Sequence, residues 1–181
     1  MDQINIETET KITYDIYKKF YLFSLFKGKL YRQKPKLIFS TGAIGIIVSL
    51  FSGFLYGFDP VIISALIVLV VLLILLIYLM VYIPKKYYRS ATRMLGSLIS
   101  FKFTDNYFYV ESKTDGASGS SEIYYEKLYK IYEVDDVLYI FISNAQAYIV
   151  EKRNLDPEEL QKLKRILKDK LGKMYKNYST N

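Results

Sequence analysis

Two long uncharged apolar runs, separated by a short turn, constrain this chain more than any other feature. Residues 37–58 read LIFSTGAIGIIVSLFSGFLYGF and residues 61–83 read VIISALIVLVVLLILLIYLMVYI. Each run exceeds the roughly 20 residues that cross a bilayer core of about 30 Å. Two buried core helices this apolar would need a far larger protein around them than a chain of 181 residues provides. The runs therefore predict a transmembrane helical hairpin at 37–83.

The turn between the two runs contains residues that end one helix and begin another. Gly57 can end the first helix, because glycine readily adopts the backbone conformation that follows a helix. Pro60 suits the first turn of the second helix, where its missing N–H costs nothing. The acid that precedes it, Asp59, is then expected at the tip of the hairpin.

Basic residues flank the hairpin on both sides and are missing from its tip. They are Lys27, Lys29, Arg32, Lys34 and Lys36 before the first run, and Lys85, Lys86, Arg89 and Arg93 after the second. Loops rich in lysine and arginine stay on the cytoplasmic side of a membrane. The pattern predicts a multi-pass protein of the cell membrane with both termini in the cytoplasm.

Small residues recur every four positions along the first run, at Thr41, Gly45, Ser49, Gly53 and Gly57. Such a stripe lets another helix approach closely, which favours helix packing in lipid. The stripe fits either a homodimer seam or packing against the second helix of the same hairpin. We favour the second interpretation, because the hairpin partner is always present.

The N-terminal segment, 1–36, is expected to be cytoplasmic. Residues 4–12 alternate early, with Ile4 and Ile6 on one side, and predict a short strand. Thr13 can cap a following helix, rich in Tyr, Phe and Lys, that lies in the headgroup region. We expect this helix to break from the first apolar run at Lys27-Gly28-Lys29.

The C-terminal segment, 84–181, changes to the period of two that is typical of strands. About six strands are expected from residue 97 to residue 152, with turns at Asp105-Asn106 and Asp135-Asp136 and a loop at 114–121. A final helix is predicted from Asp156 as N-cap and Pro157 as first residue. Its expected apolar face contains Leu160, Leu163, Leu167, Leu171 and Met174.

These elements predict an α+β protein: a two-helix transmembrane hairpin plus a small antiparallel β-sheet domain capped by a C-terminal helix. That outline is pleckstrin-homology-like. Since both termini are expected on one side, the strand at 4–12 can join the sheet, and the hairpin would then be an insertion in the domain.

The run IYYEKLYKIYEVDDVLYIFISNAQAYIVEKRNL also resembles the YcxB-like proteins of bacteria. The resemblance lies in Tyr125 and Leu128 before Lys130 to Glu133, in the Tyr-rich strand that follows, and in Ala147 to Lys152 before a closing helix. Where a Pro-Lys pair is expected the chain has Glu151-Lys152. The resemblance implies the same arrangement, a short N-terminal part, two membrane helices and a cytoplasmic domain, and brings no catalytic residues.

Composition removes several chemistries. The chain has no histidine and no cysteine, which excludes the usual zinc sites and nucleophiles activated by histidine. The loop at 115–121 lacks the lysine of a phosphate-binding loop, and the acid pairs Asp135-Asp136 and Glu158-Glu159 have local structural reasons to occur in a turn and at a helix start. We expect no enzyme, no cofactor and no metal site.

The net charge of +7 favours anionic lipid as a neighbour, whereas its spread along a membrane protein argues against nucleic acid. The outer face of the last helix offers Lys162, Arg165, Lys168 and Lys173 for docking to lipid headgroups or to a membrane protein partner, although such faces are commonly just solvated. We expect a membrane-anchored binding or scaffolding module. A small oligomeric pore or transporter accessory subunit, and a membrane-bound enzyme of unrecognised type, are the alternatives.

Overall fold

The computed structural model describes residues 5–27, 33–90, 98–114 and 117–179. By their internal contacts the residues form two compact units. Unit 1 combines Met1–Thr13 with Ala91–Asn181, and unit 2 is Tyr14–Ser90. The N-terminal segment is thus divided between the two units after Thr13.

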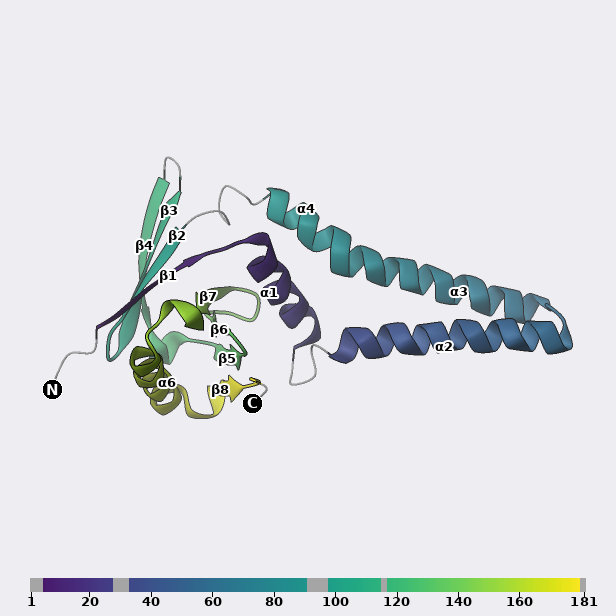
Figure 1. Cartoon of the computed structure of the whole chain (residues 1–181). Coiled ribbons are helices and arrows are strands. Elements are labelled where there is room, and N and C mark those ends of the chain that lie inside the picture. Colours follow the sequence, from purple (N-terminus) through teal and green to yellow (C-terminus); the bar gives the residue numbers. More distant parts are fainter. Residues whose placement is uncertain (1–4, 28–32, 91–97, 115–116, 180–181) are drawn as a thin grey trace. The chain divides into compact units, whose positions relative to one another are not determined.

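Unit 1 contains two four-stranded sheets and one long helix (Figure 1). The first sheet has the order β1-β2-β3-β4 with all neighbours antiparallel. Its strands are β1 (Ile6–Lys11), β2 (Leu98–Phe103), β3 (Tyr107–Thr114) and β4 (Ala117–Tyr124). The second sheet has the order β7-β6-β5-β8, and β8 runs parallel to β5. Its strands are β5 (Lys130–Val134), β6 (Val137–Phe141), β7 (Ala147–Glu151) and β8 (Tyr175–Asn177).

The predicted α+β class is confirmed, with antiparallel strands followed by a C-terminal helix. The strand expected at 4–12 does join the sheet, because β1 pairs with β2 from Ile6 opposite Phe103 to Lys11 opposite Leu98. The helices of unit 2 are therefore inserted between two neighbouring strands. The expected single sheet of about six strands is instead two sheets of four.

The prediction of a loop at 114–121 is wrong for most of these residues. Residues 117–121 are the first half of β4 and pair with β3 from Ala117 opposite Thr114 to Ser121 opposite Val110. Small polar residues are typical of loops, which is why a loop was predicted. However, the eight residues of β3 need hydrogen-bond partners, and any segment without proline can supply them from its main chain.

The core of unit 1 lies between the sheets and α6 (Pro157–Leu171). As predicted, α6 begins after Asp156 with a proline at its first position. Leu163, Leu167 and Leu171 are buried against the sheet residues. Met174, which we expected on this face, lies beyond the helix and is 38% exposed, because Gly172 turns the chain with a φ of +49°. Ile166 is buried on α6 as well.

Unit 2 consists of helices. They are α1 (Tyr14–Phe26), α2 (Gln33–Tyr56), α3 (Pro60–Ile77) and α4 (Ile83–Ser90), and a π-helical turn at Tyr78–Tyr82 links the last two. Tyr88 of α4 packs on Tyr14 and Tyr17 of α1, at ring distances of 5.5 and 5.9 Å. As expected, the helix stops before Lys27: α1 ends at Phe26, whose carbonyl accepts a hydrogen bond of 2.8 Å from Lys34. The rest of the predicted break, Gly28-Lys29, lies outside the described residues.

The hairpin turn between α2 and α3 forms as the sequence predicts. Gly57 has a φ of +92° and its N–H donates to the Gly53 carbonyl at 2.9 Å, which closes α2. Asp59 Oδ1 accepts from the Ile62 N–H at 2.8 Å, and Pro60 is the first residue of α3. The lone acid in the apolar stretch is thus a helix N-cap.

Candidate functional site

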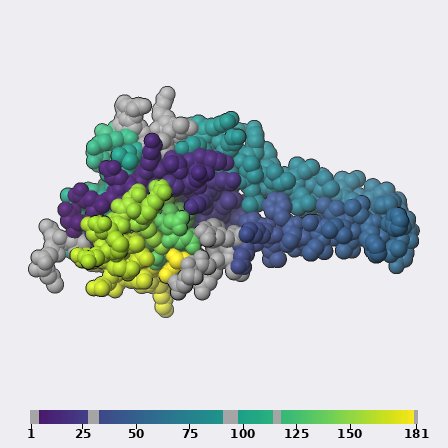
Figure 2. Space-filling view, in the orientation of Figure 1, coloured from purple at the N-terminus to yellow at the C-terminus, as the bar shows by residue number. Residues whose placement is uncertain are grey.

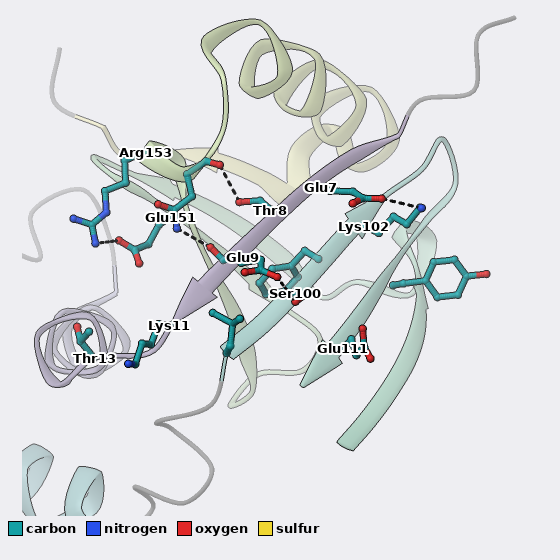
Figure 3. Close-up of a pocket in the computed structure, with 14 residues that line it drawn as sticks. Glu7, Thr8, Glu9, Lys11, Thr13, Ser100, Lys102, Glu111, Glu151 and Arg153 are labelled. Carbon is teal, nitrogen blue, oxygen red and sulfur yellow. Dashed lines mark hydrogen bonds and ion pairs between the residues drawn. The ribbon is translucent and has the colours of Figure 1, made fainter. Parts of the chain in front are cut away.

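A groove of about 980 Å³ runs along β1 on the surface of unit 1 (Figure 3). Alternate β1 residues, Glu7, Glu9 and Lys11, line it because the strand buries Ile6, Thr8 and Thr10 on its other face. Its opposite wall comes from the end of β7 and the 3₁₀ turn Lys152–Asn154. The groove therefore lies where the first sheet meets the second.

Several of the charged side chains in the groove have hydrogen-bond or ion-pair partners within it. Lys102 binds Glu7 at 2.9 Å and lowers the pKa of that carboxyl. Ser100 donates to Glu9 at 2.9 Å, and Arg153 binds Glu151 at 2.6 Å. The described residues contain no group of three acids that could hold a metal ion.

Hydrogen bonds across the groove hold β1 to the second sheet. The Glu151 N–H donates to Thr10 Oγ1 at 3.3 Å, and Asn154 Nδ2 donates to the Glu9 carbonyl at 2.6 Å. Thr8 Oγ1 donates in turn to the Asn154 carbonyl at 3.3 Å. These bonds cover the edges of both β1 and β7, so the first strand of the chain closes the junction of the two sheets.

A buried charged cluster, Glu133 with Lys152, Lys164 and Tyr175, was missed by the sequence reasoning. Glu133 is 2% exposed on β5, and its carboxylate binds Lys152 at 2.8 Å and Lys164 at 2.5 Å. Tyr175 Oη donates to it at 2.6 Å. The cluster joins β5, the turn after β7, α6 and β8. A signal was present, since Glu133 follows Ile131 by two residues and so points to the same buried face.

The electrostatics of this cluster favour the ionised carboxylate. Burial opposes ionisation of Glu133, but hydrogen bonds from Lys152, Lys164 and Tyr175 outweigh it and lower its pKa to about 2. Burial and the bond to Glu133 raise the pKa of Tyr175, which therefore stays a donor. With each group satisfied by its neighbours, the cluster is suited to holding elements together.

The four residues predicted for docking lie exposed on α6 and just beyond it. Lys162, Arg165 and Lys168 belong to α6, whose yellow-green surface is in view in Figure 2, and Lys173 follows Gly172. Lys168 Nζ lies 5.4 Å from the centroid of the Tyr175 ring. Lys164, on the same helix, is instead turned inward to Glu133. Lys164 therefore differs in its surroundings from the four exposed bases, whose docking role stays a prediction.

The small-residue stripe of α2 is divided by the structure. A Cβ on Gly45 would meet Leu69 of α3 at 3.3 Å, and one on Gly53 would overlap the Phe58 ring. Ser49 is partly buried, whereas Thr41 and Gly57 are exposed. Gly42, outside the expected stripe, also faces α3, since a Cβ there would lie 2.9 Å from Leu73. A homodimer seam along the stripe stays a prediction.

The fold and surfaces define an α+β protein with two long apolar helices inserted after its first strand. Within it, residues 103–167 match the family model of the YcxB-like protein. The resemblance found in the sequence is thereby confirmed for this segment, which runs from the end of β2 into α6. The chain has no significant match among curated proteins or among solved structures.

Proposed function

We propose that the protein is a membrane-anchored binding module, with α2 and α3–α4 crossing the membrane and a pleckstrin-homology-like unit 1 in the cytoplasm. One observation carries the proposal: apolar side chains of both helices remain exposed. Leu37, Phe54 and Val61 are 66%, 84% and 73% exposed. Monomers in water rarely tolerate apolar patches above several hundred Å². Lipid is the solvent in which such a surface is stable.

The dimensions and flanks of the helices support a spanning arrangement. Among the described residues, Gln33–Tyr56 and Pro60–Ser90 are long and apolar enough to cross a membrane. At 1.5 Å per residue, the 24 residues of α2 extend about 36 Å, more than the hydrocarbon thickness of about 30 Å. The basic flanks and the base-free tip favour cytoplasmic termini.

The topology of the hairpin is tested with single cysteines. Asp59→Cys and Ser118→Cys are each unique, because the natural chain has no cysteine. We expect a membrane-impermeant thiol reagent to label position 59 in intact cells and position 118 only after lysis. If position 118 but not position 59 were labelled in intact cells, the orientation would be the reverse of the proposed one. As a control for reagent access, both positions should be labelled in lysed cells.

The layout of unit 1 supports a docking role over a catalytic one. The proposal of a pleckstrin-homology-like unit rests on its two four-stranded sheets and the single C-terminal helix on their core. The exposed bases of α6 give that helix a cationic outer surface. Anionic lipid offers about 1 kcal/mol for each well-placed Lys or Arg. We infer that this surface docks the unit on anionic headgroups.

Docking is tested by vesicle binding of unit 1 freed from its apolar helices. We expect it to bind anionic vesicles more than neutral ones, and less as salt shortens the Debye length below about 8 Å. Reversing the charges of Lys162, Arg165 and Lys168 to Glu should remove most of the difference.

The matched control reverses Lys11, Lys127 and Lys176, which are exposed elsewhere on unit 1. This variant has the same net charge but should retain most of the binding. An equal loss in both variants would mean that net charge, and not the α6 surface, governs binding. Equal binding to neutral and anionic vesicles at low salt would leave the α6 bases as a solubility feature.

A further inference from the structure

Strand β4 is the open end of the first sheet. It comes last in the order β1-β2-β3-β4, as Figure 1 shows, and among the described residues β3 is its only strand partner. It is eight residues long, and Ser118 to Glu122 are exposed. Its first five residues, ASGSS, contain no charge and no proline. Long edges without such protection pair readily with another strand.

Two hydrogen bonds identify which groups of β4 face outward. The Tyr125 N–H donates to the Asn106 carbonyl at 3.0 Å, whereas the Tyr107 carbonyl accepts from Thr104, on the side away from β4. In an antiparallel ladder these orientations alternate with each residue. The N–H and C=O groups of Ser118, Ser120, Glu122 and Tyr124 therefore point away from β3.

The other sheet edges are protected in ways that β4 is not. The edges of β1 and β7 are joined by hydrogen bonds through Thr10, Glu151 and Asn154. Strand β8 has only three residues, and short edge strands offer little to pair with. An open edge of eight residues is thus an exception within unit 1.

We propose that β4 pairs antiparallel with β4 of a second copy of this chain, which joins two four-stranded sheets into one of eight strands. A two-fold axis at Ser121 places Ser120 opposite Glu122 and Ser118 opposite Tyr124. Every outward-facing residue then meets an outward-facing residue, and each carboxylate meets a hydroxyl.

Charge disfavours one of the neighbouring registers, the one centred on Glu122. An axis at Glu122 would set the two carboxylates directly opposite each other, which is destabilising. In the proposed register the strand pairs with its own copy without placing like charges opposite each other. The pairing adds main-chain bonds and little apolar burial, so it depends on concentration, and a shared membrane surface would raise the effective concentration.

Disulfide cross-linking of the full chain in lipid vesicles tests this geometry. In the proposed pair the two Ser121 Cα atoms are about 4.5 Å apart, within disulfide range. The two Ser118 Cα atoms are roughly 20 Å apart, three residues on either side of the axis. Mild oxidation should give at least tenfold more dimer for Ser121→Cys than for the matched control Ser118→Cys. Equal yields, or no dimer from either, would overturn the proposal.

A second pair of variants tests the main-chain pairing itself. In the Ser121→Cys background, Ser120→Pro removes an outward N–H and leaves the ladder to β3 intact, so the dimer yield should fall at least tenfold. Ser120→Ala keeps that N–H and should cross-link as before. If the proline variant loses its circular dichroism signal, Ser120→Glu replaces it, since two carboxylates would then face each other. Unchanged cross-linking in a folded Ser120→Pro or Ser120→Glu variant would refute β4 pairing.

Discussion

Replacing Glu133 with glutamine is expected to lower the free energy of unfolding of unit 1 by about 3 to 5 kcal/mol. The side chain is 2% exposed and forms ion pairs with two lysines that are themselves mostly buried. The amide has nearly the same shape but carries no charge, so Lys152 and Lys164 would remain as unpaired buried charges. Removing one partner from a buried ion pair costs more than the pair itself contributes.

The pH dependence of this effect follows from the lowered pKa of Glu133. Its pKa falls from the ordinary 4.5 to about 2 on folding. The ionised carboxylate therefore contributes its stability, about 3 kcal/mol, at pH values above 4.5. That contribution is lost as pH falls from 4.5 towards 2, because the unfolded state takes up the proton first. The difference in free energy of unfolding between the natural chain and Glu133→Gln should therefore decrease as pH falls from 4.5 towards 2.

Chemical denaturation in mild detergent, followed by near-ultraviolet circular dichroism, measures both effects, because Tyr125 and Tyr139 are 1% exposed in unit 1. Glu126→Gln is the matched control: it makes the same chemical change on an exposed side chain and should alter stability by less than about 0.5 kcal/mol. Equal midpoints for Glu133→Gln and the natural chain at pH 7 would show that the two lysines do not need their carboxylate.

The sequence was most informative where one residue type has one physical use. Gly57 and Pro60 fixed the hairpin turn because a positive φ and a missing N–H restrict where such residues fit. The alternation of apolar and polar residues predicted that Phe101 and Phe103 of β2 share a face, and both are buried because only one face of that strand contacts the core. These signals are local and need no knowledge of distant residues.

Signals that depend on distant partners were missed. Strand β4 is made of residues with weak strand preference, and it exists because β3 needs a partner. Strand β8 is three residues long and pairs parallel with β5, so that each β8 residue lies opposite a residue 44 positions earlier in the chain. No short sequence pattern predicts such a pairing. The spacing from Ile131 indicated that Glu133 is buried, but the lysines that pair with it come from two other elements and could not be identified locally. The groove along β1 likewise depends on the meeting of two sheets far apart in sequence.

Removing the inserted helices is expected to leave a folded, soluble unit 1. Lys11 lies directly opposite Leu98 in the β1–β2 ladder, so the two strands end side by side. The test protein keeps Ile12 and Thr13 and replaces residues 14–97 with a four-residue Gly/Asn turn, which suits a hairpin connection. We expect a dispersed amide spectrum and a single cooperative unfolding transition.

The matched fragment 98–181 lacks β1 and should not fold stably. Without β1, the core loses Ile6, whose burial contributes about 2 to 3 kcal/mol. The buried Glu151 N–H loses its partner on β1, Thr10 Oγ1, at about 1 to 3 kcal/mol. The sum, about 3 to 6 kcal/mol, is comparable with the total stability of a marginally stable domain. Equal urea midpoints for the two proteins would reduce β1 to an appendage, whereas failure of the joined protein to fold would mean that unit 1 needs the apolar helices.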